Sequence, residues 1–307
     1  MINASVWISA LRLRTLPLAA ASIILSAGLA AHAQIFDLSI FILLLFTALL
    51  LQILSNLAND YGDSITGADN ETRVGPLRSM QTGKITATSM KKAIIFTVIL
   101  VLLSGISLLT MALGQNVTSW LLFILLGIFA IIAAITYTMG KIPYGYRAMG
   151  DIAVFVFFGL VGVVGSYYLY DLSFNWPLLL PAISVGLLSA SVLNINNLRD
   201  LYSDKQANKI TLVVLLGRKK AFIYHLFLIL TAPVLASLYL LGLENVQTWQ
   251  FIFLLSFSPL LKSCFKLNDA ISADLRDGCI FNEELKNTAL STFVFCLLYA
   301  LVLIPMN

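Results

Sequence analysis

The sequence predicts an all-α membrane protein, and its composition carries that prediction. Of its 307 residues, 59% are hydrophobic and only 11% are charged, and the mean hydropathy is +0.92. A soluble globular domain contains about 25% charged residues. The three cysteines, which are Cys264, Cys279 and Cys296, are too few and too scattered for a disulfide framework or a metal cluster. We therefore expect one membrane domain over residues 1–307.

The apolar segments predict nine membrane-spanning helices, because about 20 apolar residues cross a bilayer as one helix. Proline and glycine punctuate helices, and Pro143, Pro177 and Gly242 mark some of the breaks. The predicted spans, in chain order, are 15–34, 38–58, 90–113, 118–139, 149–170, 177–198, 220–242, 248–267 and 287–305.

The basic residues predict the orientation of these spans. All 19 Lys and Arg residues fall before the first span or on alternate connections, whereas the opposite connections hold only Asp37, Asp171 and Glu244 as charged groups. Loops rich in Lys and Arg stay in the cytoplasm. The N-terminus and the long loops are therefore expected to be cytoplasmic, and nine spans then leave the C-terminus outside.

Two acidic, Asn-rich clusters end the second and the sixth span. The first reads NLANDYGD and pairs Asn56 with Asp60, followed by Asp63. The second reads NINNLRDLYSD and pairs Asn196 with Asp200, followed by Asp204. Spacings of three or four residues place the carboxylates of each cluster on one helix face.

Both clusters are expected at helix C-terminal ends in the same leaflet, where the helix dipole disfavours carboxylates. Polar caps reaching into water would explain one such aspartate, but two matching clusters favour a site, because interfacial carboxylates in membranes are usually functional. Hard oxygen ligands together with substrate phosphates select Mg²⁺. The clusters lie 140 residues and four spans apart, which suggests two four-helix halves plus a ninth helix, with the site at their junction.

Basic residues near the clusters are candidates to hold the remaining phosphate charge, although each is equally explained by membrane topology. These candidates are Arg73, Arg78, Lys84, Lys141, Arg199 and Lys205. Tyr137 and Lys141 share a helix face at the end of the fourth span. Asp151 opens the fifth span, where stabilising the helix N-terminus explains it as well as a role in a site does. His225 is more simply explained as a packed core residue.

These motifs resemble the UbiA superfamily of intramembrane aromatic prenyltransferases over nearly the whole chain. The strings NLANDYGDSITGADNETRVGPLR and LLSASVLNINNLRDLYSDKQANKITLVVLLGR look most like the branch that prenylates 1,4-dihydroxy-2-naphthoate in menaquinone synthesis. The resemblance implies a nine-helix bundle whose central cavity opens towards the cytoplasm. It also implies a bacterial inner membrane location.

The resemblance further implies roles for individual residues. Asp60, Asp63, Asp200 and Asp204 would bind Mg²⁺ and the prenyl diphosphate, assisted by Asn56, Asn59, Asn196 and Asn197. Lys141 and Arg199 would contact the diphosphate, and Tyr137 would lie close to the allylic carbon. Arg73 and Arg78 are substrate-binding candidates from their charge and position. Many members carry a third aspartate four residues after the second, but here that position is Gly67, and Asp69 is the candidate replacement as a metal ligand.

The implied reaction ionises a polyprenyl diphosphate with two Mg²⁺ ions. The dihydroxynaphthoate ring then attacks the allylic cation and loses CO2, giving demethylmenaquinone, with Asp151 as a partner for an acceptor hydroxyl. Another aromatic acceptor, such as 4-hydroxybenzoate or homogentisate, is an alternative, and a secondary transporter is a second one. The expected partners are both substrates and the lipid bilayer, with no nucleic acid and no obligatory protein partner. Prenyl chain length and oligomeric state stay open.

Overall fold

The computed structural model describes residues 4–67, 74–75, 77–275 and 278–304. Within these ranges the chain is helical, and nine helical runs are long and apolar enough to cross a membrane. This confirms the predicted all-α, nine-span fold of a multi-pass membrane protein. The α-helices are α1 (Ala4–Leu11), α2 (Leu16–His32), α3 (Leu38–Ile65), α4 (Ala87–Leu113), α5 (Val117–Thr136), α6 (Gly150–Val154), α7 (Ser166–Asp171), α8 (Leu179–Gln206), α9 (Leu212–Leu241), α10 (Phe257–Ser272) and α11 (Gly278–Leu303).

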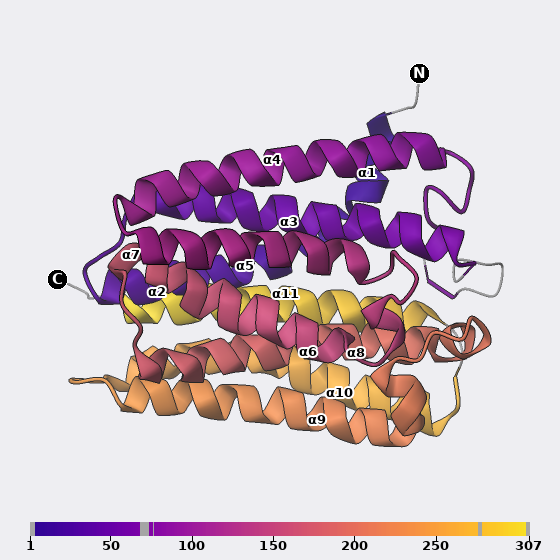
Figure 1. Cartoon of the computed structure of the whole chain (residues 1–307). Coiled ribbons are helices and arrows are strands. Elements are labelled where there is room, and N and C mark those ends of the chain that lie inside the picture. Colours follow the sequence, from indigo (N-terminus) through magenta and orange to yellow (C-terminus); the bar gives the residue numbers. More distant parts are fainter. Residues whose placement is uncertain (1–3, 68–73, 76, 276–277, 305–307) are drawn as a thin grey trace.

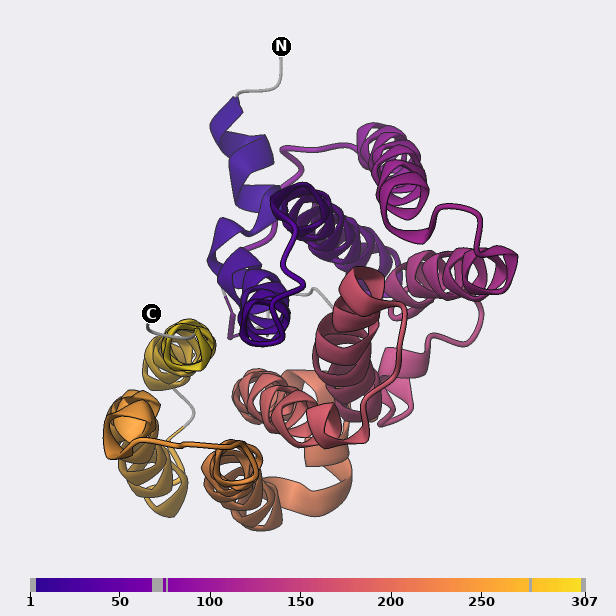
Figure 2. The same ribbon diagram turned by 90° about the vertical axis from the view of Figure 1, so that its left-hand side faces the viewer.

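The helices follow one another around an irregular ring, which closes where α11 packs against α2 (Figures 1 and 2). Helices α6 and α7 are the two ends of a single span, joined by a π-helical stretch over Phe155–Gly165. The Ser22 hydroxyl of α2 donates a 2.6 Å hydrogen bond to the Phe158 carbonyl in this stretch. Such wide turns are rare, and they are often found next to functional sites.

Helices α3 and α8 extend beyond the predicted spans. Their final turns carry both acidic clusters inside continuous helix, since α3 ends at Ile65 and α8 at Gln206. Hydropathy detects only the part of a helix that is apolar, so polar terminal turns are left out. Asp37 begins α3 by accepting hydrogen bonds from the backbone N–H groups of Ser39 and Ile40, as an N-cap should.

Two other helices are interrupted near the end of the bundle that holds the acidic clusters. Arg12 has a left-handed backbone (φ 51°) and separates α1 from the first span. Gly217, at φ 72° and ψ 164°, breaks α9 after its first turns, and the predicted start of that span at residue 220 falls just after this break. Glycine suits this position because it adopts positive φ without a Cβ clash.

Candidate active site

The end of α3 places a buried carboxylate pair against two arginines. Asp60 and Asp63 are 1% and 2% exposed. The Asp60 carboxylate accepts a 2.9 Å hydrogen bond from Arg12, and Arg78 Nε lies 3.6 Å from the same oxygen. Arg78 also donates to Asp63 Oδ2 at 2.7 Å and to the Asn59 carbonyl at 3.0 Å. Charge-assisted bonds of this kind neutralise carboxylates that burial would otherwise destabilise.

The end of α8 holds its cluster through one arginine. The Arg199 guanidinium donates to both oxygens of Asp200, at 2.8 and 2.5 Å. It also donates to the side-chain oxygens of Asn196 on α8 and Asn282 on α11, each at 2.8 Å. This planar group is therefore fixed on three sides by residues from two helices.

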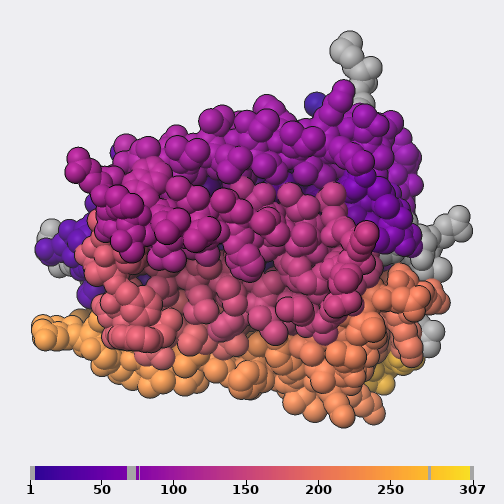
Figure 3. Space-filling model, in the orientation of Figure 1, coloured from indigo at the N-terminus to yellow at the C-terminus, as the bar shows by residue number. Residues whose placement is uncertain are grey.

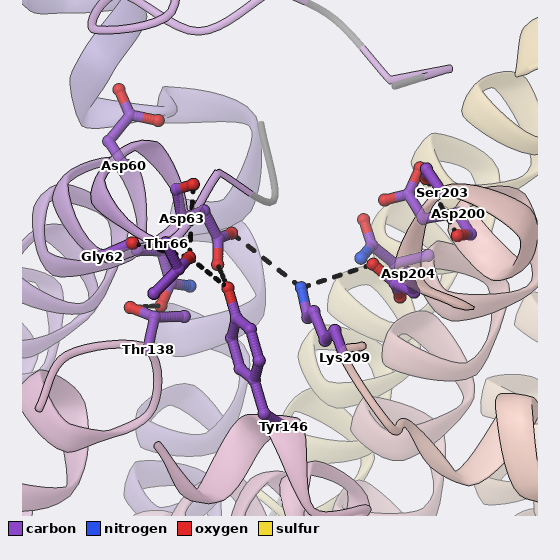
Figure 4. Close-up of polar contacts among 12 residues, drawn as sticks. Asp60, Gly62, Asp63, Thr66, Thr138, Tyr146, Asp200, Ser203, Asp204 and Lys209 are labelled. Carbon is purple, nitrogen blue, oxygen red and sulfur yellow. Dashed lines mark hydrogen bonds and ion pairs between the residues drawn. The ribbon is translucent and has the colours of Figure 1, made fainter. Parts of the chain in front are cut away.

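Lys209 joins the two clusters. Its Nζ lies 3.9 Å from Asp63 Oδ2 and 3.6 Å from Asp204 Oδ1, so that one ammonium group contacts a carboxylate from α3 and another from α8 (Figure 4). Tyr146 donates a 2.8 Å hydrogen bond to the other oxygen of Asp63, and the Lys209 ammonium lies 5.4 Å from the centre of the Tyr146 ring.

The two loops that carry Tyr146 and Lys209 pair with each other. Arg147 and Ile210 form an isolated parallel bridge, in which the Ala148 N–H donates to the Ile210 carbonyl at 2.7 Å and the Ile210 N–H to the Tyr146 carbonyl at 3.3 Å. Thr211 then caps α9. Backbone pairing between the α5–α6 and α8–α9 connections therefore places these side chains beside the carboxylates.

Burial and charge act together on the titratable groups between the helices. Burial lowers the pKa of Lys209, but the carboxylates of Asp63 and Asp204 raise it more, so it lies above its ordinary value. Burial and then Asp63 raise the pKa of Tyr146. Burial, followed by Asp151 and Asp63, raises the pKa of Tyr137. At neutral pH the lysine is therefore charged and both phenols keep their protons.

A cavity of about 850 Å³ runs from these polar groups into the apolar bundle. Nine of the predicted site residues line it, namely Asn56, Asn59, Asp60, Asp63, Arg78, Tyr137, Asn196, Asn197 and Arg199. Its remaining wall is largely apolar and comes mainly from α2, α3, α4, α5 and the 150–171 span. The cavity thus combines a charged end with a long hydrophobic interior.

Other predicted site residues lie elsewhere. Asp200 and Asp204 are not on the cavity wall, although Arg199 and Lys209, which they contact, are. Lys141 is exposed at the surface and does not line the cavity. Asp151 is buried, interacts electrostatically with Tyr224 on α9 and does not line the cavity. The contacts predicted for Lys141 and Asp151 stay predictions.

Asp69 and Arg73 lie outside the described residues, so their predicted roles remain open. In the described part of the chain, no group of three or more His, Cys, Asp or Glu side chains is gathered closely enough to hold a metal ion. Each cluster instead supplies two carboxylates, and every one of these four contacts a basic side chain. Any metal here would therefore draw ligands from the substrate as well as from the protein.

Four residues at the site were not predicted as site residues. Arg12 and Lys209 carry charge, but in the sequence they are explained by topology alone. Tyr146 and Asn282 have no distinguishing spacing. The sequence signal for Lys209 is its position five residues after Asp204, in the short connection between α8 and α9.

Comparison with known proteins agrees with the family resemblance seen in the sequence. Residues 19–268 match the UbiA prenyltransferase family. The chain is 49% identical to a 1,4-dihydroxy-2-naphthoate octaprenyltransferase of Escherichia coli, covering 83% of this chain and 82% of that protein. It is 38% identical to the Mycobacterium tuberculosis protein of the same name, covering 79% and 80%.

Two archaeal structures share the fold. A UbiA homologue from Aeropyrum pernix has a TM-score of 0.61 at 18% identity and covers 96% of this chain and 97% of its own. A homologue from Archaeoglobus fulgidus, bound to DMAPP and Mg²⁺, has a TM-score of 0.58 at 18% identity, covering 95% and 98%. The resemblance drawn from the Asp clusters is confirmed, and this chain belongs to the UbiA prenyltransferase family.

Proposed function

We propose that this protein transfers a polyprenyl group from its diphosphate to 1,4-dihydroxy-2-naphthoate, with loss of CO2 and diphosphate, giving demethylmenaquinone in its quinol form. The observation that carries the proposal is the meeting of two Asp clusters, from α3 and α8, around Lys209 at the charged end of a hydrophobic cavity. The names of the relatives that are 38% to 49% identical over most of the chain support the acceptor.

The donor set suits Mg²⁺. This ion takes one or two carboxylates together with substrate phosphates and water, rather than an all-protein cage. The two carboxylates that each cluster supplies satisfy that requirement. In addition, Asp204 Oδ2 is buried without a hydrogen-bond partner among the described residues. Asp60 and Asp63 on one side and Asp200 and Asp204 on the other would hold the metal, which when bound neutralises charge on the departing diphosphate.

Basic side chains at the same end of the cavity suit the diphosphate itself. Arg12, Arg78, Arg199 and Lys209 all line the cavity, and each contacts a carboxylate of one of the clusters. With substrate bound, these cations can direct N–H groups towards the phosphate oxygens while the carboxylates bind metal. Donors that are already in place stabilise the developing charge with little reorganisation.

The cavity wall beyond the diphosphate suits an allylic cation. The buried hydroxyl of Tyr137 lies so close to Gly150 that a Cβ there would come within 2.8 Å of it, and the aromatic ring lines the cavity. An aromatic face attracts a cation, and an apolar wall keeps water from competing with the acceptor ring. The phenol keeps its proton, so it acts as a neutral dipole rather than as a base.

The orientation in the membrane is part of the proposal. The α3–α4, α5–α6, α8–α9 and α10–α11 connections lie at the same end of the bundle as both Asp clusters (Figure 1). These connections, together with the helix segments next to them, carry most of the basic residues. The positive-inside rule assigns that end to the cytoplasm. Substrates would therefore enter from the cytoplasmic side of the bacterial inner membrane, with the C-terminus outside.

The test is turnover by the purified, detergent-solubilised protein. We expect octaprenyl diphosphate, Mg²⁺ and 1,4-dihydroxy-2-naphthoate to give demethylmenaquinone, with all product lost on addition of EDTA and recovered on addition of excess Mg²⁺. A parallel reaction with 4-hydroxybenzoate is expected to give none. Product from 4-hydroxybenzoate alone would refute the acceptor, and product in EDTA would refute the metal.

A further inference from the structure

Two buried polar side chains outside the cavity hold atoms without hydrogen-bond partners. Asn194 on α8 is 0% exposed and Asp151 on α6 is 5% exposed, and neither lines the cavity. The oxygen and nitrogen of the Asn194 amide and Oδ1 of Asp151 are all unpaired within the described part of the chain. Buried polar atoms are almost always bonded to protein or to ordered water, so these three atoms point to a partner other than the chain itself.

Asp151 and Asn194 lie at about the same level of the bundle. A Cβ on Gly150 would come within 3.3 Å of the Leu193 side chain, so the start of α6 packs against α8 at this residue. Asp151 follows Gly150 in the chain, and Asn194 follows Leu193. Each residue advances a helix by about 1.5 Å, so the two polar side chains start close to one contact point.

Tyr224 on α9 lies at that level too. The Ser184 hydroxyl donates to the Ala232 carbonyl at 2.8 Å, which sets the register of α8 and α9, two antiparallel helices. Tyr224 comes eight residues before Ala232, so it lies opposite the residue eight positions after Ser184, which is Val192. The Tyr224 phenol interacts electrostatically with Asp151. It is half-buried, on the helix that forms the lower part of the face shown in Figure 3.

All three side chains lie on the flank of α8 that faces away from the cavity. Ser184 and Leu193 point in opposite directions, towards α9 and α6, because nine residues make about two and a half helical turns. Val192 and Asn194 project from the two flanks between those directions. Val192 lines the cavity, so Asn194 occupies the other flank. The carboxyl–phenol pair joins α6 to α9 without lining the cavity, and it therefore crosses the same flank.

The chemistry of the unpaired atoms selects water as the ligand. They comprise two oxygens, which accept hydrogen bonds, and one amide nitrogen, which donates them. A metal ion would bind the oxygens and leave the amide N–H groups unpaired, whereas an anion would bind only the N–H groups. A water molecule both donates and accepts, and a buried water typically makes about three such bonds. One water can therefore serve all three atoms.

We propose that Asp151, Asn194 and Tyr224 form an internal site for a water molecule that ties α6 to α8 and α9. The site lies directly behind Tyr137, because a Cβ on Gly150 would come within 2.8 Å of the Tyr137 hydroxyl. By fixing the start of α6, the water makes Asp151 and Asn194 positioning residues for this phenol. That consequence rests on the proposed function, in which Tyr137 faces the allylic cation, whereas the water site itself does not.

An experimental density map of the protein in lipid nanodiscs, at a resolution that shows ordered water, tests occupancy directly. We expect a water peak within about 3.2 Å of both Asp151 Oδ1 and the Asn194 amide. A map without a peak there, or one with a direct hydrogen bond between the two side chains, would overturn the proposal. This measurement does not depend on turnover.

A double-mutant cycle tests whether the two side chains share one ligand. Asn194→Ala and Asp151→Ala should each lower Tm by about 4 °C. The double variant should lose about 5 °C rather than about 8 °C, because the second change acts on a site that has already lost its water. Ser26→Ala on α2 is the matched control, since the Ser26 hydroxyl is also buried and unpaired among the described residues, and its effect should add to that of Asn194→Ala. Additive losses within the pair itself would contradict a shared water.

Kinetics separate positioning from general destabilisation. Asn194→Ala should lower kcat for prenyl transfer by about fivefold in the otherwise unaltered protein, and by less than about twofold when combined with Tyr137→Phe, which has no hydroxyl to contact Gly150. Equal losses in both backgrounds would overturn the positioning role. A raised KM for the naphthoate would also overturn it, because it would assign the site to the acceptor's hydroxyl. If the unaltered protein transfers no prenyl group, the proposed function fails, and the map and the cycle still decide the water site.

Discussion

The two Asp clusters look alike in sequence, but they are held in place differently. In the most apolar part of the span that contains α8, 72% of residues are buried inside the protein, against 17% for α3. Asp200 is paired with the adjacent Arg199, which α11 anchors through Asn282. Asp60 and Asp63 depend on Arg12 from the N-terminal segment and Arg78 from the α3–α4 connection.

The difference indicates a fixed half and an adjustable half of the site. A carboxylate held by its own helix and a packed neighbour has little freedom, whereas one held from a connecting loop can exchange partners when that loop moves. Lys209, on the α8–α9 connection, contacts Asp204 as well as Asp63, so the fixed carboxylate of the α8 cluster is Asp200.

The largest expected effect comes from removing a carboxylate from either side of Lys209. Asp63→Asn and Asp204→Asn should each lower kcat/KM for prenyl transfer by about 1,000-fold, since each removes negative charge that metal and lysine share. The double variant should lose much less than the product of the two effects, because both act through one centre. Strictly multiplicative losses in steady-state assays would show that the two clusters work separately.

A smaller effect, on stability, distinguishes the two halves directly. Arg199→Met removes the guanidinium that donates to both carboxylate oxygens of buried Asp200 and should cost about 3 kcal/mol of unfolding free energy. Arg12→Met should cost less than about 1 kcal/mol, because Arg12 is partly exposed and Arg78 still contacts Asp60. Denaturation in detergent, with matched protein and detergent concentrations, measures both. Equal losses would contradict the fixed and adjustable division.

The third comparison concerns two lysines. Lys209→Met should raise KM for the prenyl diphosphate by about tenfold, because it removes the cation between the clusters. Lys141→Met should change KM by less than about twofold, since Lys141 is exposed and off the cavity wall. Steady-state kinetics with varied donor tests both, and a larger effect at Lys141 would restore the role implied for it by family resemblance.

The smallest effect is expected at Asn282. Asn282→Ala removes one hydrogen bond to Arg199 and should raise KM for the donor by about fivefold with little change in kcat. Asn282→Gln, which keeps the amide, should recover part of the loss, whereas Asn287→Ala on the same helix serves as a control off the cavity wall. No change at Asn282 would mean that α8 holds Arg199 without help from α11.

Local sequence patterns determine the membrane spans and the helix positions of the cluster residues. Apolar runs predict the nine spans, and the spacing of Asn56, Asp60 and Asp63 predicts their common helix face, because both depend only on neighbouring residues. The alternation of basic loops predicts that both clusters share one end. The tertiary structure alone decided that Lys209 and Tyr146 reach Asp63 and that Asn282 anchors Arg199. These partners are 83 to 146 residues apart in the chain, and such contacts follow from how helices and loops pack, which local sequence patterns do not specify.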